Sequence, residues 1–134
     1  MNLYVLSVDD VLAIYREICE TDAAPARPDG LESAVAAPFA TFGGEYLHAD
    51  VFAMAAALLR SIAQNQPFVD GNKRVGWVAA VSFLQFNGFD VHATADDVVS
   101  VMVRLANREI DVDGIAAFLA DRVVRPAEAS RTEP

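Results

Sequence analysis

The sequence predicts an all-α, single-domain protein, a compact bundle of about six helices. Apolar residues recur with a helical period through most of the chain. The length of 134 residues is that of one ordinary domain, and the hydrophobic fraction of 54% is enough to build a core. No internal repeat is visible and no linker separates two cores. We therefore expect one domain over residues 1–125 and a frayed C-terminal tail over residues 126–134.

The first amphipathic helix is predicted to begin after Ser7, a natural N-cap that is followed by acidic residues in the first turn. Its apolar side consists of Val8, Val11, Leu12, Tyr15, Ile18 and Cys19. On this side Cys19 is expected to be a buried small hydrophobe. Residues 21–30 contain two prolines and a glycine, which predict a loop. A short helix over Leu31–Ala37 then ends before Pro38.

Two longer helices are predicted in the middle of the chain. Residues 39–47 hold paired glycines between aromatic residues, which indicates a turn or small hairpin. An alanine-rich helix follows from about Ala49 to Gln64, and residues 65–71 break it. The next helix runs from Asn72 to Asn87, with Gly88 as its C-terminal cap. We expect this second helix to be the central one, because apolar residues nearly encircle it: Trp77, Val78, Val81, Phe83, Leu84 and Phe86.

Two further helices complete the expected bundle. The segment Thr94-Ala95-Asp96-Asp97 resembles a capping box and opens a helix that ends near Asn107. Asp111 is expected to cap a last helix, whose apolar residues are Ile115, Phe118, Leu119 and Val123.

The composition excludes several classes of function. With 10 basic and 19 acidic residues the formal net charge is −9, which argues against a nucleic-acid partner because phosphate-backbone binding needs a basic stripe. No apolar run approaches the roughly 20 residues of a membrane span, and residues 1–6 are too short for a signal-peptide core, so a cytoplasmic location is expected. The single cysteine excludes an internal disulfide framework and a multi-cysteine zinc site, and the two histidines leave little for a histidine-based metal site.

The polar loop between the two middle helices offers a candidate site. The loop Gln66-Pro67-Phe68-Val69-Asp70-Gly71-Asn72-Lys73-Arg74 leads directly into a helix N-terminus, where free N–H groups and the helix dipole favour an anion. The only lysine of the chain, Lys73, stands there beside Arg74. Gly71 permits a tight turn, and Asp70 can hold a magnesium ion between phosphate oxygens. The alternative is a capped loop whose charges simply face water.

This loop resembles the signature of the Fic/Doc superfamily, His-x-Phe-x-(Asp/Glu)-(Ala/Gly)-Asn-(Lys/Gly)-Arg. The Asn-Lys-Arg form is typical of the Doc (death on curing) branch. Phe68, Asp70, Gly71, Asn72, Lys73 and Arg74 all match. The likeness extends to residues 31–44 before the signature and to residues 83–88 after it. The resemblance implies a Fic fold, and a site in which Phe68 is structural.

The resemblance also implies an activity. Fic proteins transfer part of a nucleotide to a protein hydroxyl, and adenylyl transfer is their common reaction. Doc proteins instead move the terminal phosphoryl group of ATP to elongation factor Tu and so stop translation. By resemblance Asp70 binds Mg²⁺, and Gly71, Asn72, Lys73 and Arg74 cradle the phosphates of ATP. Residues 41–47 correspond to the flap that aligns the target peptide.

The chain departs from the signature at its most consequential position. The family histidine, the general base that deprotonates the target hydroxyl, falls on Gln66, and neither His48 nor His92 lies in the motif. A carboxamide does not usefully accept a proton at neutral pH, whereas a general base contributes about 10²–10⁴ in rate. We therefore expect nucleotide and magnesium binding to survive and turnover to be severely reduced. Gln66 is either the natural residue of a degenerate member or an introduced change that silences a toxic protein.

Smaller departures bear on the branch and on regulation. After the arginine, Val75 and Gly76 replace the usual threonine and alanine of Doc proteins, and either nucleotide or helix packing would explain Gly76. Trp77 stands where adenylylating Fic proteins have a second arginine, which argues against that branch. No inhibitory helix of the family pattern is evident in the sequence, so the inhibitor is expected to be a small antitoxin acting in trans.

Three functional hypotheses follow from these residues. The first is a Doc-type kinase toxin of a toxin–antitoxin system, disarmed at Gln66, whose substrate is a translation factor. The second is an adenylyl or other nucleotidyl transferase. The third is a catalytically inactive homologue that binds a nucleotide or an antitoxin.

Overall fold

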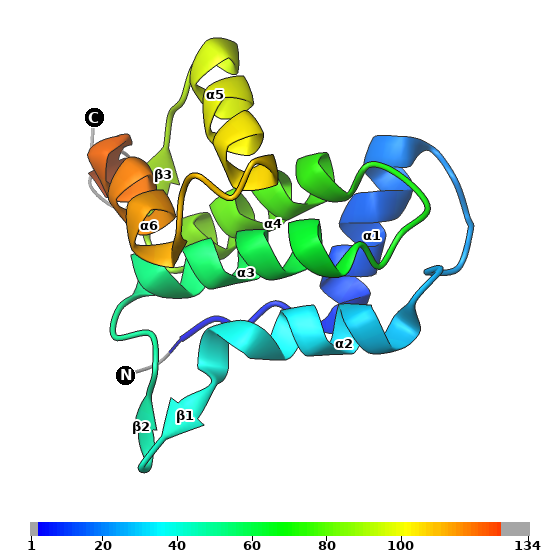
Figure 1. Cartoon of the computed structure of the whole chain (residues 1–134), viewed down its shortest axis with the longest axis horizontal. Helices are drawn as coiled ribbons and strands as arrows, with labels where there is room; N and C mark the ends of the chain where they lie inside the picture. The colour runs from blue at the N-terminus through cyan, green and yellow to red at the C-terminus, as the bar shows by residue number, and fades with distance from the viewer. Residues whose placement is uncertain (1–2, 127–134) are drawn as a thin grey trace, which may run out of the picture.

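The computed structural model describes residues 3–126. The all-α prediction is confirmed: six α-helices form one bundle, with a 3₁₀ turn and two small strand pairs (Figure 1). In chain order the elements are α1 (Val8–Cys19), α2 (Pro28–Ala36), η1 (Ala37–Phe39), β1 (Thr41–Phe42), β2 (Glu45–Tyr46), α3 (Val51–Asn65), α4 (Asn72–Phe86), β3 (Phe89–Val91), α5 (Ala95–Ala106), α6 (Val112–Asp121) and β4 (Val123–Pro126). Within the described part of the chain, no helix combines the length and apolarity that a membrane crossing requires.

Helix α3 is the centre of the bundle, and α4 packs along one side of it (Figure 1). The prediction that the helix after the polar loop is central is wrong. Helix α3 contacts α2, α4, α6 and η1, and its alanines let these neighbours approach closely. On α4 the predicted encircling residues are not all covered: Trp77, Val78 and Val81 are half-buried and Phe86 is 56% exposed.

Gly76 lies at the contact between α3 and α4. A Cβ atom at this position would stand 3.0 Å from Cδ1 of Leu59 and 3.2 Å from the backbone oxygen of Leu59. Both distances are tighter than ordinary van der Waals contact, so a side chain here would require Leu59 to shift by a few tenths of an ångström. Packing against a helix therefore explains the glycine that replaces the usual alanine.

The predicted helix starts are confirmed where they depend on side-chain caps. Ser7 and Asp10 form a reciprocal capping box on α1. Thr94 and Asp111 each accept a hydrogen bond from the third residue of the helix that they cap. Asp50, which was not predicted as a cap, caps α3 in the same way, so this helix begins at Val51 and not near Ala49. Helix α2 begins at Pro28, not at the predicted Leu31, because a proline in the first turn needs no hydrogen-bond donor.

The pair β3–β4 was not predicted. These strands are antiparallel and join Phe89–Val91 to the segment after α6. Val123, predicted as part of the last helix, lies in β4, because α6 ends at Asp121. Of the predicted C-terminal tail only Pro126 is described, as the last residue of β4, and the remainder lies outside the described residues.

An ion pair fixes the junction of α5 with the end of α6. Nε of Arg122 donates to the carboxylate of Asp97 at 3.2 Å, and the guanidinium carbon lies 3.9 Å from the centre of the Phe118 ring. The hydrogen bond from Arg122 holds the pKa of the Asp97 carboxyl below its ordinary value.

The predicted hairpin at residues 39–47 is present as β1 and β2. Gly43 and Gly44 form its turn with φ of 61° and 84°, the left-handed values that a two-residue hairpin turn requires. The hairpin stands at the N-terminal end of α3, whereas the polar loop leaves its C-terminal end (Figure 1). A 15-residue helix is about 22 Å long, so residues 41–47 do not adjoin the polar loop, and their role in aligning a target peptide stays a prediction.

Candidate active site

The polar loop begins at Gln66, where α3 ends in a left-handed residue with φ of 48°. A guanidinium nitrogen of Arg27 donates to the Gln66 carbonyl oxygen at 2.8 Å, and the Arg27 N–H donates to the carbonyl oxygen of Pro67 at 2.9 Å. These two bonds attach the loop to the start of α2. The Gln66 backbone is thus fixed, and its exposed side chain is free to face a ligand.

Phe68 anchors the loop in the core. Its side chain is only 1% exposed and stacks on the ring of Tyr15, with ring centres 4.0 Å apart and planes 9° apart. The structural role that the resemblance implied for this residue agrees with this burial. Val69, the next residue, is 76% exposed, so the loop turns outward immediately after its anchor.

Asn72 closes the loop with its side-chain amide. Its oxygen accepts from the Phe68 N–H at 3.0 Å, and its NH₂ donates to the Phe68 carbonyl oxygen at 2.9 Å. Both ends of the amide therefore bind the loop itself. The second N–H of the amide and the backbone N–H at the start of α4 remain for a phosphate contact.

Gly71 is the N-cap of α4 and has a left-handed backbone with φ of 76°. It provides no side-chain cap, so the first N–H groups of α4 remain open to an anion. A Cβ atom here would lie 2.7 Å from Sγ of Cys19, so only glycine fits without a shift. Cys19 itself is half-buried against this turn, not fully buried as predicted.

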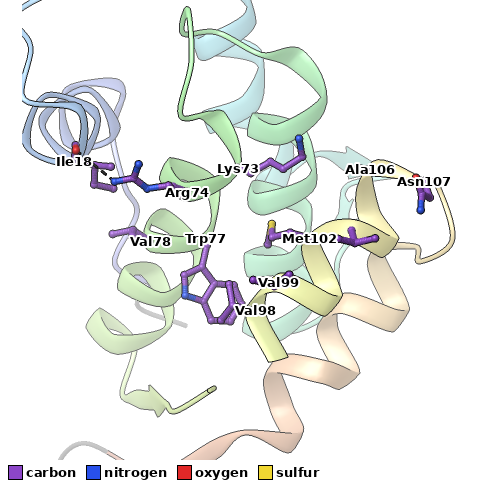
Figure 2. A pocket seen from close by; sticks show the side chains of 11 residues that line it. Ile18, Lys73, Arg74, Trp77, Val78, Val98, Val99, Met102, Ala106 and Asn107 are labelled. Carbon is purple, nitrogen blue, oxygen red and sulfur yellow. Dashed lines mark hydrogen bonds between the residues drawn. The ribbon is translucent and has the colours of Figure 1, made fainter. Parts of the chain in front are cut away.

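The side chains of Lys73 and Arg74 extend from the start of α4 in different directions. Figure 2 shows Arg74 extending toward α1, where a guanidinium nitrogen lies 3.5 Å from the carbonyl oxygen of Ile18, while Lys73 extends toward the opposite side. Both side chains are exposed, and neither forms an ion pair with any residue among those described. Their charge is therefore available to a ligand.

One pocket unites the residues singled out from the sequence. A cavity of about 300 Å³ is lined by Ala63 and by Gln66, Asp70, Gly71, Asn72, Lys73 and Arg74. Neither His48 nor His92 is among its lining residues, so no histidine takes the place that Gln66 occupies. Asp70 is exposed at the rim, and it is the only carboxylate of this pocket.

The side chains that line this pocket can hold Mg²⁺ only together with a phosphate ligand. Over residues 3–126 no cluster of three or more His, Cys, Asp or Glu side chains is placed to hold a metal by itself. Mg²⁺ is typically held by one or two carboxylates together with substrate phosphates. A single carboxylate beside open N–H groups and two cations agrees with that arrangement.

A larger apolar groove, which the sequence did not reveal, adjoins the pocket. It has a volume of about 690 Å³, starts at Lys73 and Arg74, and continues between α4 and α5 (Figure 2). Its walls are Ile18, Trp77, Val78, Val98, Val99, Met102, Val103, Ala106 and Asn107. Val99 and Val103 are 59% and 51% exposed, and their place beside the groove is visible only once α5 is placed.

Comparison with known proteins agrees with this geometry. The model of the Fic/DOC family matches residues 5–84, which include α1, the polar loop and most of α4. The chain belongs to the Fic/DOC family. It is also 45% identical over 92 residues to the protein named Toxin Doc of Mycolicibacterium smegmatis, and the match covers 67% of this chain and 71% of that protein.

The Fic/DOC match ends before α5. The pocket around Gln66 and Lys73 therefore lies within the part shared with the family, whereas the outer wall of the apolar groove lies beyond residue 84. The structure extends the family site with side chains that the family match does not cover.

Proposed function

We propose that this chain is a Doc-type toxin of a toxin–antitoxin system, whose reaction is Mg²⁺- and ATP-dependent phosphoryl transfer to a hydroxyl of elongation factor Tu. We propose further that Gln66 severely impairs the reaction. The observation that carries the proposal is the single pocket that collects Gln66, Asp70, Lys73 and Arg74 at an open helix N-terminus. The likeness to Toxin Doc supports it.

The pocket supplies most of what phosphoryl transfer needs. Such transfer depends largely on positioning and on stabilising the charge of the phosphoryl oxygens. The open N–H groups of α4 and the side chains of Lys73 and Arg74 offer that stabilisation from fixed positions. Mg²⁺ bound at Asp70 would neutralise charge on the phosphates. Asn72 and Phe68 hold the loop in shape, and only the proton acceptor is missing.

The Asp70→Asn variant is expected to lose affinity for Mg²⁺-ATP by about tenfold or more, because contacts to a charged group contribute about 1.5–3 kcal/mol. Its affinity for ATP without Mg²⁺ should be unchanged or higher, since a negative charge is removed beside the phosphates. Titration calorimetry with and without Mg²⁺ measures both. The matched control is Asp113→Asn, an exposed carboxylate in the first turn of α6. An equal loss in both variants, or none in Asp70→Asn, would contradict the metal role.

The antitoxin is proposed to bind along the apolar groove between α4 and α5. The groove is lined almost wholly by apolar side chains, and the exposed valines of α5 stand at its rim (Figure 2). An amphipathic helix buries its apolar face in such a groove. Because the groove starts at Lys73 and Arg74, a bound helix would also lie beside the entrance of the pocket.

The Val99→Glu variant is therefore expected to weaken antitoxin binding by about 30-fold or more, because burial of an unpaired carboxylate at an interface costs at least about 2 kcal/mol. The matched control is Val124→Glu on β4, since Val124 is 60% exposed and Val99 is 59% exposed. Calorimetry with the antitoxin protein compares the three chains. Wild-type affinity in Val99→Glu would place the antitoxin elsewhere.

A catalytically inactive nucleotide-binding homologue is the second candidate, and Gln66 favours it. This alternative expects Mg²⁺-ATP to bind and no group to be transferred, even when histidine stands at position 66. The two candidates differ in that single outcome.

A further inference from the structure

A second small cavity opens beside the Gln66–Lys73 pocket. It has a volume of about 170 Å³ and lies where three helices end or begin. The end of α3 contributes Ala63 and Gln64, the loop after it contributes Gln66, and the start of α4 contributes Lys73. The end of α5 contributes Leu105 and Ala106, and the turn after α5 contributes Arg108. Ala63, Gln66 and Lys73 line both cavities, so the second one continues the first toward α5.

The backbone after α5 holds Arg108 at this cavity. The Arg108 N–H donates to the Leu105 carbonyl oxygen at 3.1 Å, and the Glu109 N–H donates to the Arg104 carbonyl oxygen at 2.8 Å. Arg108 has a left-handed backbone with φ of 60°. These bonds end the helix in a tight turn, so the residue is fixed although its side chain is exposed.

The lining of the second cavity is cationic. It contains the Lys73 ammonium, the Arg108 guanidinium and two side-chain amides, and no carboxylate. Over residues 3–126 the one ion pair joins Arg122 to Asp97, so no carboxylate among these residues pairs with Lys73 or Arg108. Asp70 lines only the first cavity, and Glu109 lines neither. In a chain of net charge −9, two unpaired cations that face one cavity form a place suited to an anion.

We propose that Arg108 and Lys73 form a second phosphate subsite, which binds the part of the nucleotide's phosphate chain that extends beyond the N-terminus of α4. The planar guanidinium of Arg108 can donate two parallel hydrogen bonds to one phosphate group, while Lys73 acts as a point charge shared by both cavities. This inference rests on the proposed nucleotide function. Arg108 lies outside the part of the chain that the family match covers.

The test uses three probes on the full chain: tripolyphosphate, ATP and adenosine, each measured by titration calorimetry. In Arg108→Gln the affinity for tripolyphosphate and for ATP is expected to fall about tenfold or more, as for the loss of a charge-assisted contact. The affinity for adenosine should not change, because adenosine carries no phosphate. The matched control is Arg104→Gln, which removes an exposed arginine in the last turn of α5 that lines neither cavity and should change each affinity less than about twofold.

Each outcome of this experiment decides the proposal. Equal effects of the two arginine variants, or failure of the wild type to bind tripolyphosphate, would overturn the subsite. A loss that extends equally to adenosine in Arg108→Gln would also overturn it, because the change would then be structural. Tripolyphosphate binding could depend on Arg108 while Gln66→His transfers no phosphoryl group. In that case the phosphate subsite is supported and only the proposed phosphoryl transfer is contradicted.

Discussion

Replacement of Gln66 by histidine is expected to raise the rate of γ-phosphoryl transfer to elongation factor Tu by about 10²–10⁴, the usual contribution of a positioned general base. The backbone at position 66 is already fixed by Arg27, and the side chain is exposed on the pocket that contains Lys73 and Asp70. Histidine can therefore occupy this position without rearrangement of the loop. Its ordinary pKa of about 6.5 leaves it neutral at pH 7, so the restored rate should fall as the pH drops below about 6.5.

The matched control for this restoration is Gln85→His. Gln85 is also an exposed glutamine, and it lies on α4 and lines neither cavity. This variant is expected to remain as slow as the wild type, because its imidazole lies outside both cavities. A time course of phosphate incorporation measures all three chains. Equal gains from histidine at positions 85 and 66 would mean that the pocket does not orient the target hydroxyl.

Replacement of Phe68 by alanine is expected to lower the free energy of unfolding by about 3–5 kcal/mol, as for other buried phenylalanines. The ring is 1% exposed and stacked on Tyr15, so its removal leaves a cavity between α1 and the loop. Since domains of this kind are stable by only about 5–15 kcal/mol, a large part of the total would be lost. Nucleotide affinity should fall as well. The Phe68 ring anchors the backbone segment to which the Asn72 amide is hydrogen-bonded, so without the ring the whole loop is held less firmly.

Denaturant unfolding followed by circular dichroism measures the effect on stability. Phe68→Leu serves as the comparison, because it retains most of the apolar volume and loses the ring stack, and it should cost clearly less than alanine. A cost below about 1 kcal/mol for Phe68→Ala would show that the loop is not anchored by this ring.

The parts of the fold that depend on neighbouring residues could be predicted from the sequence. Caps such as Ser7, Thr94 and Asp111 act within one helical turn, and paired glycines specify a hairpin turn by backbone conformation alone. The pair β3–β4 could not be predicted, because Phe89–Val91 is too short to show a period of two and its partner follows α6. The central helix was assigned wrongly because large apolar residues on α4 outweighed the alanines of α3, whose small size gives α3 its close neighbours.

The candidate site likewise has a part that could be predicted from neighbouring residues and a part that could not. Residues 66–74 are contiguous, so their shared pocket follows from one turn and one helix start. The groove and Arg108 depend on where α5 lies against α4, and the contacts of α5, such as the Asp97–Arg122 ion pair, join residues far apart in the chain. The distance between the hairpin and the loop, which is the full length of α3, likewise became visible only once the helix was placed.

We propose that the Gln66–Lys73 pocket is a phosphoryl-transfer site that lacks only its general base. The decisive experiment incubates the wild type and Gln66→His with Mg²⁺, elongation factor Tu and ATP that is labelled on either the α- or the γ-phosphate. We expect label on elongation factor Tu from the γ-phosphate with Gln66→His, and little or none with the wild type. Label from the α-phosphate, or no label from either position although ATP binds, would contradict it.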